Sequence, residues 1–162
     1  RIAWFKVHQP LAYYCAYYTI RAKAFDYEMM AQGKEHLLQC MQEYQARDKL
    51  TAAEEAQMDD ALIVREMYAR GIGFTPIQLG VAHGRAFQIV DGKIMPAYTS
   101  IHGMGANAAD ALEEACKGGP FVSQQDIRER AKVSQTILEK MSELGLLGEL
   151  PESNQFSLFD FM

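Results

Sequence analysis

The sequence is poor in the residues and spacings that mark several common kinds of protein. It has three cysteines among 162 residues, Cys15, Cys40 and Cys116, and no two of them form a C-x-x-C pair. An odd number of widely separated cysteines argues against a disulfide framework and fits reduced thiols inside a cell. The four histidines lack the spacing of metal ligands, and they are His8, His36, His83 and His102. We therefore expect no metal and no cofactor in this chain.

Two further absences concern membranes and nucleic acids. No apolar run approaches the roughly 20 residues that a membrane-spanning helix needs, and no signal peptide opens the chain. The formal net charge of −5 argues against the broad basic surface that a free-standing DNA-binding protein usually carries. Any contact with DNA must therefore be local, or must use charge from neighbouring parts. Because the chain begins at Arg1 within a helical pattern, with no initiator Met and no cap, we expect it to be a piece of a longer protein.

The most informative stretch is a Gly-x-Gly turn at the start of a helical pattern. Gly103 and Gly105 flank Met104, and Ala106 and Asn107 open the pattern. Glycines at this spacing let the backbone turn tightly, so that several N–H groups converge in front of a helix. A helix N-terminus with free donors binds anions, and a nucleic-acid phosphate is a common one. The alternative is a plain glycine turn before a helix.

A small antiparallel sheet is expected just before this turn, and a second helical hairpin after it. Residues 77–81 alternate, residues 86–90 resemble a strand, and Asp91-Gly92 is a hairpin turn leading into residues 93–95. After the helix at 107–117, Ser123 and Ser134 are each expected to cap a helix. The side chains expected near this second turn are Arg128, Arg130, Lys132, Ser134 and Gln135. Acidic neighbours offset these charges, so the expected DNA contact is led by the backbone and independent of sequence.

The first half of the chain reads as helical. Aromatic residues at positions 13, 14, 17 and 18 lie on one helical face, which we interpret as a core face. Asp26 is expected to cap a helix that continues past Gly33 to Met41. Thr51 and Glu54 form a capping box that opens a long helix ending at residue 71. The acids at positions 54, 55, 59 and 60 point in different directions around this helix, so we interpret them as a solvated face rather than a metal site.

The C-terminal residues 155–162 carry large apolar side chains on a free terminus. One interpretation is that they pack on the chain itself. The other is that a partner protein binds them in a groove, with Leu158 and Phe159 as anchors and Gln155 at the rim.

Five segments together resemble the C-terminal portion of the PolC-type DNA polymerase III alpha subunit, the replicative polymerase of low-GC Gram-positive bacteria. They occur in the order of that family and cover essentially the whole chain. They are Arg1-Ile-Ala-Trp-Phe-Lys-Val-His with Pro10-Leu-Ala-Tyr-Tyr, Tyr18-Thr-Ile-Arg-Ala with Phe25-Asp26, Ser100-Ile-His-Gly-Met-Gly-Ala-Asn-Ala-Ala, Lys132-Val-Ser-Gln-Thr-Ile-Leu and Gln155-Phe-Ser-Leu-Phe.

The resemblance implies a mainly α fold with a small antiparallel β-hairpin, an α+β class. Residues 1–73 would be the last helices of a fingers domain, and residues 74–150 a tandem helix-hairpin-helix domain that grips primer-template duplex. Residues 151–162 would be a tail that binds the sliding clamp, the beta subunit, through Gln155, Leu158 and Phe159. His102 stands where the family often has proline, and Phe156 where it usually has leucine. Both departures bear on affinity.

The resemblance also implies a parent enzyme, a DNA-directed DNA polymerase with a proofreading 3′-5′ exonuclease. Its chemistry would use two Mg²⁺ ions on palm-domain carboxylates. We see no such carboxylates here, so we expect no catalytic residue in this chain. Further partners would be other replisome proteins, in the cytoplasm at the nucleoid and not at a membrane. Two alternatives stay open: a stand-alone, non-enzymatic DNA-binding clamp adaptor, and a helical interaction domain without a nucleic-acid role.

Overall fold

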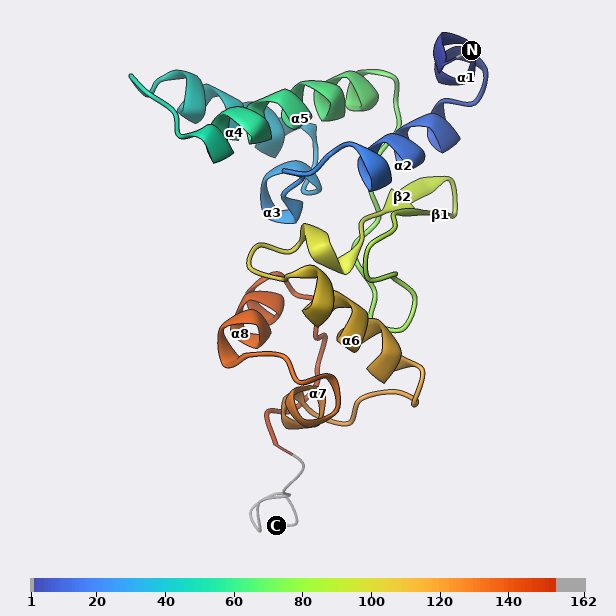
Figure 1. Cartoon of the computed structure of the whole chain (residues 1–162), viewed down its shortest axis with the longest axis vertical. Coiled ribbons are helices and arrows are strands. Elements are labelled where there is room, and N and C mark those ends of the chain that lie inside the picture. The colour runs from blue at the N-terminus through green and yellow to red at the C-terminus, as the bar shows by residue number, and fades with distance from the viewer. Residues whose placement is uncertain (1, 154–162) are drawn as a thin grey trace.

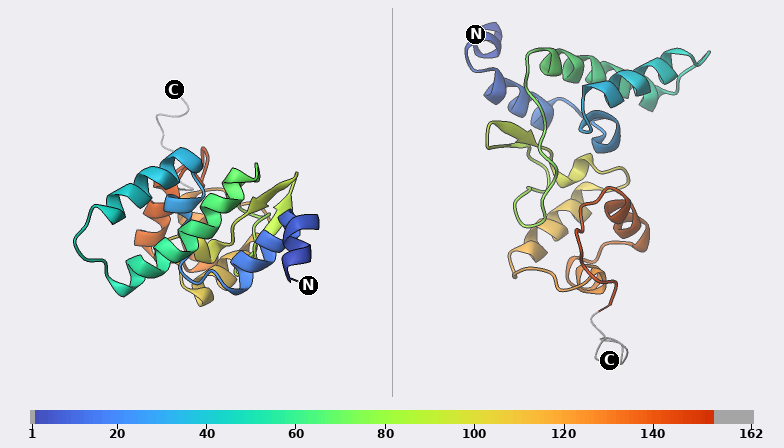
Figure 2. Two further views of the ribbon diagram at one scale, coloured as in Figure 1. Left: turned by 90° about the horizontal axis from the view of Figure 1, so that it is seen from above. Right: turned by 180° about the vertical axis from the view of Figure 1, so that it is seen from behind.

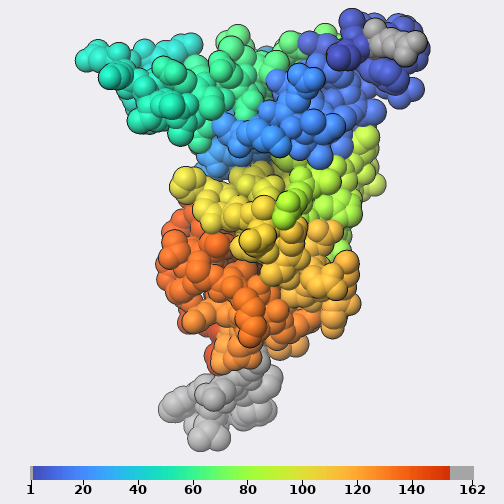
Figure 3. All heavy atoms as spheres, viewed as in Figure 1, coloured from blue at the N-terminus to red at the C-terminus, as the bar shows by residue number. Residues whose placement is uncertain are grey.

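The computed structural model describes residues 2–153, which form two groups of helices stacked end to end (Figure 1). A two-stranded sheet lies between the groups, and the space-filling view shows the resulting elongated molecule (Figure 3). The upper group contains α1 (Ile2–His8), α2 (Pro10–Ile20), α3 (Tyr27–Met30), α4 (Lys34–Gln45) and α5 (Ala52–Ala69). The lower group contains η1 (Tyr98–Ser100, a 3₁₀ turn), α6 (Ala106–Cys116), α7 (Gln124–Ala131) and α8 (Gln135–Glu143). The expected fold class, mainly α with a small antiparallel hairpin, is confirmed.

The helix starts follow the sequence signals. Pro10 opens α2, where its missing N–H costs nothing. The capping box at α5 is present, because the Thr51 side chain accepts from the Glu54 N–H and the Glu54 carboxylate accepts from the Thr51 N–H. Ser123 and Ser134 cap α7 and α8 as expected.

The helix expected from Asp26 to Met41 is instead two helices, α3 and α4, with a break before Lys34. Gly33 has φ +105°, which a helix cannot contain. The hydroxyl of Tyr68 on α5 stabilises this break, because it donates to the Met30 carbonyl at 2.6 Å and accepts from the Gly33 N–H at 3.3 Å. Burial raises the pKa of Tyr68 to about 12, so the hydroxyl stays protonated. The sequence signal for the break was the glycine, and its partner comes from 35 residues away.

The sheet consists of β1 (Gln88–Val90) and β2 (Lys93–Met95), paired antiparallel with Ile89 opposite Ile94. Asp91 and Gly92 have positive φ, as the two-residue hairpin turn requires. The alternating residues 77–81 form no strand; instead the N–H groups of Val81 and Ala82 both donate to the Gln78 carbonyl. The tight turn there replaces strand pairing.

Two hydrophobic cores meet at β2. Ile94 is fully buried in the upper core, with Tyr14, Leu37 and Met67 among others. Met95 is fully buried in the lower core, which is built by α6, α7, α8 and the segments around them. Successive side chains of a strand point to opposite faces, so one three-residue strand contributes to both cores. Phe74 and Phe87 pack in the upper core, although both lie within the expected domain 74–150. The domain boundary expected between residues 73 and 74 stays a prediction.

The guanidinium of Arg130 joins α7 to the end of α6. It donates to the carbonyls of Ala115 at 2.8 Å, Gly119 at 2.9 Å and Pro120 at 3.1 Å. It also pairs with Asp126 and lies over the Phe121 ring, 4.5 Å from its centroid. Arg130 is therefore a packing residue of the lower core.

We predict that Ile94→Ala and Met95→Ala each lower the free energy of unfolding by about 2–5 kcal/mol, since each leaves a cavity in a different core. Ile89→Ala on β1 is the matched control, because Ile89 is 45% exposed, and we expect it to cost less than about 1 kcal/mol. Urea unfolding monitored by circular dichroism measures all three. A loss for Ile89→Ala as large as for the two β2 variants would contradict this account of β2.

Candidate nucleic-acid interface

The Gly-x-Gly turn joins η1 to α6. The Met104 N–H donates to the Ile101 carbonyl at 3.0 Å, and Gly103 between them has φ +87°. This is a β-turn whose third residue needs positive φ, which is why glycine suits the position. Ile101 and Met104 are buried in the lower core, whereas Gly103 is exposed. The Met104 side chain thus anchors the turn, and only its backbone is available to a ligand.

The start of α6 presents free donors to solvent. Gly105 is the N-cap residue, and no side chain caps the helix there. Gly105, Ala106 and Asn107 are exposed, so their N–H groups are accessible. An uncapped N-terminus of an 11-residue helix combines unpaired donors with the positive end of the helix dipole. This geometry suits a phosphate, and the role of these residues in binding DNA stays a prediction.

A second turn of similar form lies between α7 and α8. Lys132, Val133 and Ser134 stand where Gly103, Met104 and Gly105 stand in the first turn. Lys132 has φ +59°, and Val133 is buried in the lower core beside Met104. Ser134 has φ −72° and ψ 159°, against −72° and 166° for Gly105. The second turn, which the sequence analysis expected before Ser134, thus resembles the first, with lysine in place of glycine.

The two turns differ in their helices and in their capping. Before the first turn stands only the short η1, whereas α7 precedes the second. The Ser134 hydroxyl accepts from the Ile137 N–H at 3.3 Å, so one donor of α8 is already satisfied. We expect the start of α6 to be the stronger anion site for this reason.

Positive charge at the second turn comes from two side chains. Arg128 and Lys132 are exposed, and neither forms an ion pair with any residue between 2 and 153. Arg128 donates to the Gln135 side-chain oxygen at 3.2 Å, and Gln135 donates to Glu139 at 3.2 Å. The structure thus brings Arg128, Lys132, Ser134 and Gln135 together. Arg130 was expected nearby as a further charge, but its guanidinium faces the end of α6.

A hollow of about 380 Å³ lies beside the first turn, between it and the link from α2 to α3. His102 and Lys23 line it, and so does Asp26, whose Oδ1 is buried without a hydrogen-bond partner. Burial raises the pKa of the Asp26 carboxyl, and the nearby His102 imidazole opposes that shift. Asp26 thus shares this hollow with Gly103 and Gly105 of the turn. Sequence reasoning placed Asp26 at a helix cap, yet its side chain makes no capping hydrogen bond.

Within residues 2–153, no three His, Cys, Asp or Glu side chains are grouped so as to hold a metal ion. None of the described helices is long and apolar enough to cross a membrane.

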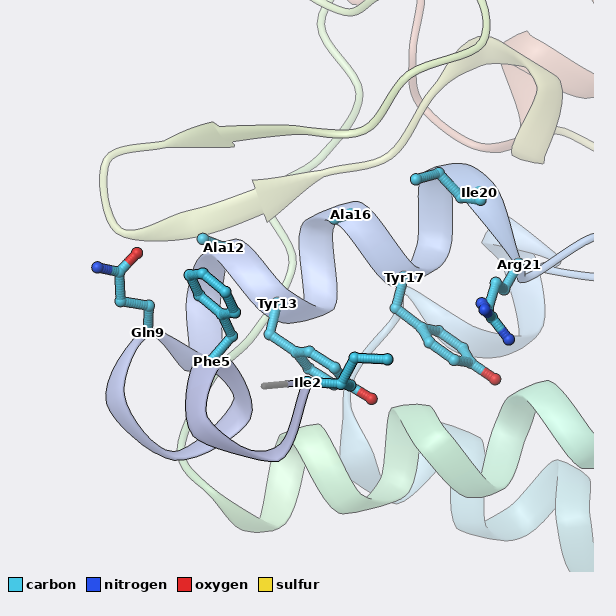
Figure 4. Close-up of a pocket in the computed structure, with 9 residues that line it drawn as sticks. All are labelled: Ile2, Phe5, Gln9, Ala12, Tyr13, Ala16, Tyr17, Ile20 and Arg21. Carbon is cyan, nitrogen blue, oxygen red and sulfur yellow. The ribbon is translucent and has the colours of Figure 1, made fainter.

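An apolar groove of about 530 Å³ lies between α1 and α2 (Figure 4). Ile2 and Phe5 of α1 line it on one side, and Tyr13, Tyr17 and Arg21 follow along α2 on the other. No residue of α1 is buried, and four of its large apolar side chains are about half to two-thirds exposed: Ile2, Trp4, Phe5 and Val7. The expected aromatic core face is therefore confirmed only for Tyr14 and Tyr18, which are buried. Tyr13 and Tyr17 line the groove.

The arrangement of paired turns, each with a buried apolar residue followed by a helix N-terminus, is that of a helix-hairpin-helix. The family model of the helix-hairpin-helix motif matches residues 72–156, and the chain belongs to this family.

Among curated proteins, the chain is similar to DNA polymerase III PolC-type from streptococci. It is 40% identical to those of Streptococcus pneumoniae and Streptococcus suis, and 39% identical to that of Streptococcus sanguinis. Each alignment covers 163 residues, 99% of this chain and 11% of the relative. The resemblance seen in the sequence is thus confirmed, and the chain spans about a ninth of the length of these relatives. The expected clamp-binding residues Gln155, Leu158 and Phe159 lie outside the described residues.

We predict that Lys132→Gly stabilises the fold while weakening DNA binding. Glycine takes positive φ without the strain that lysine has there, but it loses more backbone entropy on folding. The net effect should add about 0.5–1 kcal/mol to the free energy of unfolding. Loss of the positive charge should lower affinity for duplex DNA several-fold. Urea unfolding and fluorescence anisotropy measure the two effects. The control Lys49→Gly, at an exposed lysine between α4 and α5, should not strengthen the fold; affinity equal to wild type for Lys132→Gly would remove Lys132 from the interface.

We predict that Asp26→Asn raises the melting temperature near neutral pH. The folded-state pKa of Asp26 is raised, so the folded protein binds this proton more tightly than the unfolded chain does. Wild type therefore loses stability as the pH rises from about 4 through the raised pKa, and the variant lacks this loss. The gain should be largest near about pH 7 and vanish near about pH 4. Asp59→Asn, at an exposed carboxylate on α5, is the control; an equal gain at both pH values would contradict the assignment.

Proposed function

We propose that this chain is the C-terminal part of a replicative DNA polymerase of the PolC type. In this proposal it holds the primer-template duplex behind the active site. The observation that carries the proposal is the pair of turns, each with a residue of positive φ, a buried apolar residue and a helix start, anchored on the lower core by Met104 and Val133. The similarity to PolC-type polymerases along the chain supports the same conclusion.

The grip acts through the DNA backbone. The N–H groups of Gly105, Ala106 and Asn107 donate to one phosphate, and the second turn contacts another with Lys132 and Arg128. Backbone amides and two unpaired cations carry no base-reading geometry, so the contact does not depend on DNA sequence. The small number of contacts gives a moderate affinity, which suits a protein that must move along its substrate.

Polymerisation itself belongs to other parts of the polymerase in this proposal. Palm-domain carboxylates would hold two Mg²⁺ ions, and a separate exonuclease would proofread. We assign the chain a binding function only, at the replisome in the cytoplasm.

The upper group of helices is then the end of the fingers domain. The apolar groove between α1 and α2 supports this, since its lining residues Ile2 and Phe5 are about half or more exposed, which is costly in water. The relatives are about nine times longer than this chain, and the proposed occupant of the groove is the remainder of that fingers domain.

The tail completes the proposed function by tethering the polymerase to the sliding clamp. Leu158 and Phe159 are the anchors and Gln155 the polar rim contact, with Phe156 and the extra residues after Phe159 as departures from the usual motif. A tether raises the effective concentration of the polymerase at the primer end, so a moderate grip supports processive synthesis.

The deciding experiment measures binding of the chain to duplex DNA by anisotropy over a series of salt concentrations. We expect binding that weakens with salt, and a slope reduced by about 0.9 for each phosphate contact removed. Arg128→Ala/Lys132→Ala should lower both affinity and slope, whereas Lys34→Ala/Lys49→Ala removes the same charge away from the turns and should change neither. Equal affinities for the two double variants, or no binding by the folded chain, would overturn the DNA-binding proposal and favour a helical interaction domain.

The same preparations test the tether. Purified sliding clamp should bind wild type, but not Gln155→Ala/Leu158→Ala/Phe159→Ala, whose DNA affinity should equal that of wild type. A triple variant that still binds the clamp would contradict the role of these residues. The coding sequence that precedes Arg1 distinguishes the polymerase from the rival clamp adaptor. Only the polymerase proposal requires palm-domain carboxylates in that preceding sequence.

A further inference from the structure

A second groove, of about 430 Å³, lies beside the Gly-x-Gly turn, between Ser100 and Ala106. It lies between the end of α2, the loop before β1 and the start of α6. Its lining includes Lys23, Arg85, Thr99 and Ala106, and the nearly buried rings of Phe25 and Phe87. Ala106 is the first residue of α6, so the groove opens directly beside the proposed phosphate-binding amides.

Two polar side chains of this groove, Lys23 and Thr99, have no side-chain partner among the described residues. Lys23 is exposed and forms no ion pair with another described residue. The Thr99 hydroxyl makes no hydrogen bond within the described residues, although its backbone N–H donates to Gly84. Two other hydroxyls are occupied, because Ser100 donates to the Ala97 carbonyl at 2.6 Å and Thr19 to the Cys15 carbonyl at 2.9 Å.

Arg85 keeps part of its donor capacity. Its Nε and Nη2 donate to the two carboxylate oxygens of Asp110 on α6, at 3.0 and 2.6 Å. Nη1 has no partner among the described residues, and a guanidinium has five N–H donors. The pair fixes the guanidinium next to α6, so Asp110 positions Arg85 while partly neutralising it.

Lys23 links this groove to the hollow at the first turn, since it lines both. Two acidic residues close to Lys23, Asp60 and Asp26, do not line the groove. Asp60 accepts from the Ala24 N–H at 2.9 Å, and Asp26 lines only the hollow on the other side. The groove itself therefore has net donor character, next to a helix N-terminus.

From this arrangement we propose that the groove binds the phosphodiester that neighbours the one held by Gly105–Asn107 on the same DNA strand. Lys23 supplies the charge, Thr99 a hydroxyl donor and Arg85 its free Nη1. This inference rests on the proposed function and extends it, because it directs the strand from the first hairpin towards the end of α2. The helix-hairpin-helix turns would then be part of a longer phosphate track that includes the upper helices.

The test compares Lys23→Ala and Thr99→Val with wild type in the salt-dependent DNA-binding measurement. For Lys23→Ala we expect a several-fold loss of affinity and a slope reduced by about 0.9. For Thr99→Val, which removes a neutral donor, we expect a smaller loss with the slope unchanged. Lys49→Ala is the matched control, since it removes an unpaired exposed lysine of the same charge at a distance from the turns.

Each outcome decides a separate point. If Lys23→Ala behaves like Lys49→Ala while Arg128→Ala/Lys132→Ala still weakens binding, the groove proposal is wrong and the hairpin proposal stands. If neither affects binding, the hairpin proposal fails first. A free deoxynucleoside triphosphate offers the same phosphate chemistry, so it is titrated without DNA; binding that depends on Lys23 in this arm would assign the groove to a nucleotide and overturn the DNA-strand proposal.

Discussion

Strand β2 is the constraint on which the rest of the molecule depends. Its residues Ile94 and Met95 are both fully buried, on opposite faces, in two different cores. The backbone of Ile94 also pairs outside the hairpin, because its carbonyl accepts from the Thr75 N–H and its N–H donates to the Gly73 carbonyl. Side-chain packing and backbone hydrogen bonds thus fix the upper and lower helices on one short strand. Figure 2 shows the sheet between the two groups of helices from two further sides. A helix-hairpin-helix unit attached by a free linker would lack this fixed relation.

That relation matters for the proposed phosphate track. Only η1 lies between β2 and the Gly-x-Gly turn that opens α6. The position of β2 therefore sets the position of the α6 N-terminus. Lys23 reaches the same place from the end of α2, in the upper group. Contacts such as the Lys140–Glu28 ion pair, between α8 and α3, add a second connection at the surface. A surface pair of this kind contributes little energy, so the orientation depends mainly on the buried strand.

The turns at Gly103 and Lys132 show that different residues take positive φ at corresponding positions before a helix. Glycine at position 103 takes positive φ without strain, whereas Lys132 does so at a cost of about 1–2 kcal/mol. A buried apolar residue follows in both cases and holds the turn against the core. The residue at the N-cap then decides how open the helix start is, with Ser134 satisfying one donor that Gly105 leaves free.

The sequence by itself determined the local features, because they depend on neighbours a few residues apart. The caps at Thr51, Ser123 and Ser134, the Asp91-Gly92 hairpin turn and the Gly103 turn are all of this kind. Long-range contacts decided the rest. The break at Gly33 needed the Tyr68 hydroxyl, and Arg130 was turned inward by carbonyls at the end of α6. Lys23 and the first residue of α6 line one groove only when both cores form, since packing and not spacing brings those residues together.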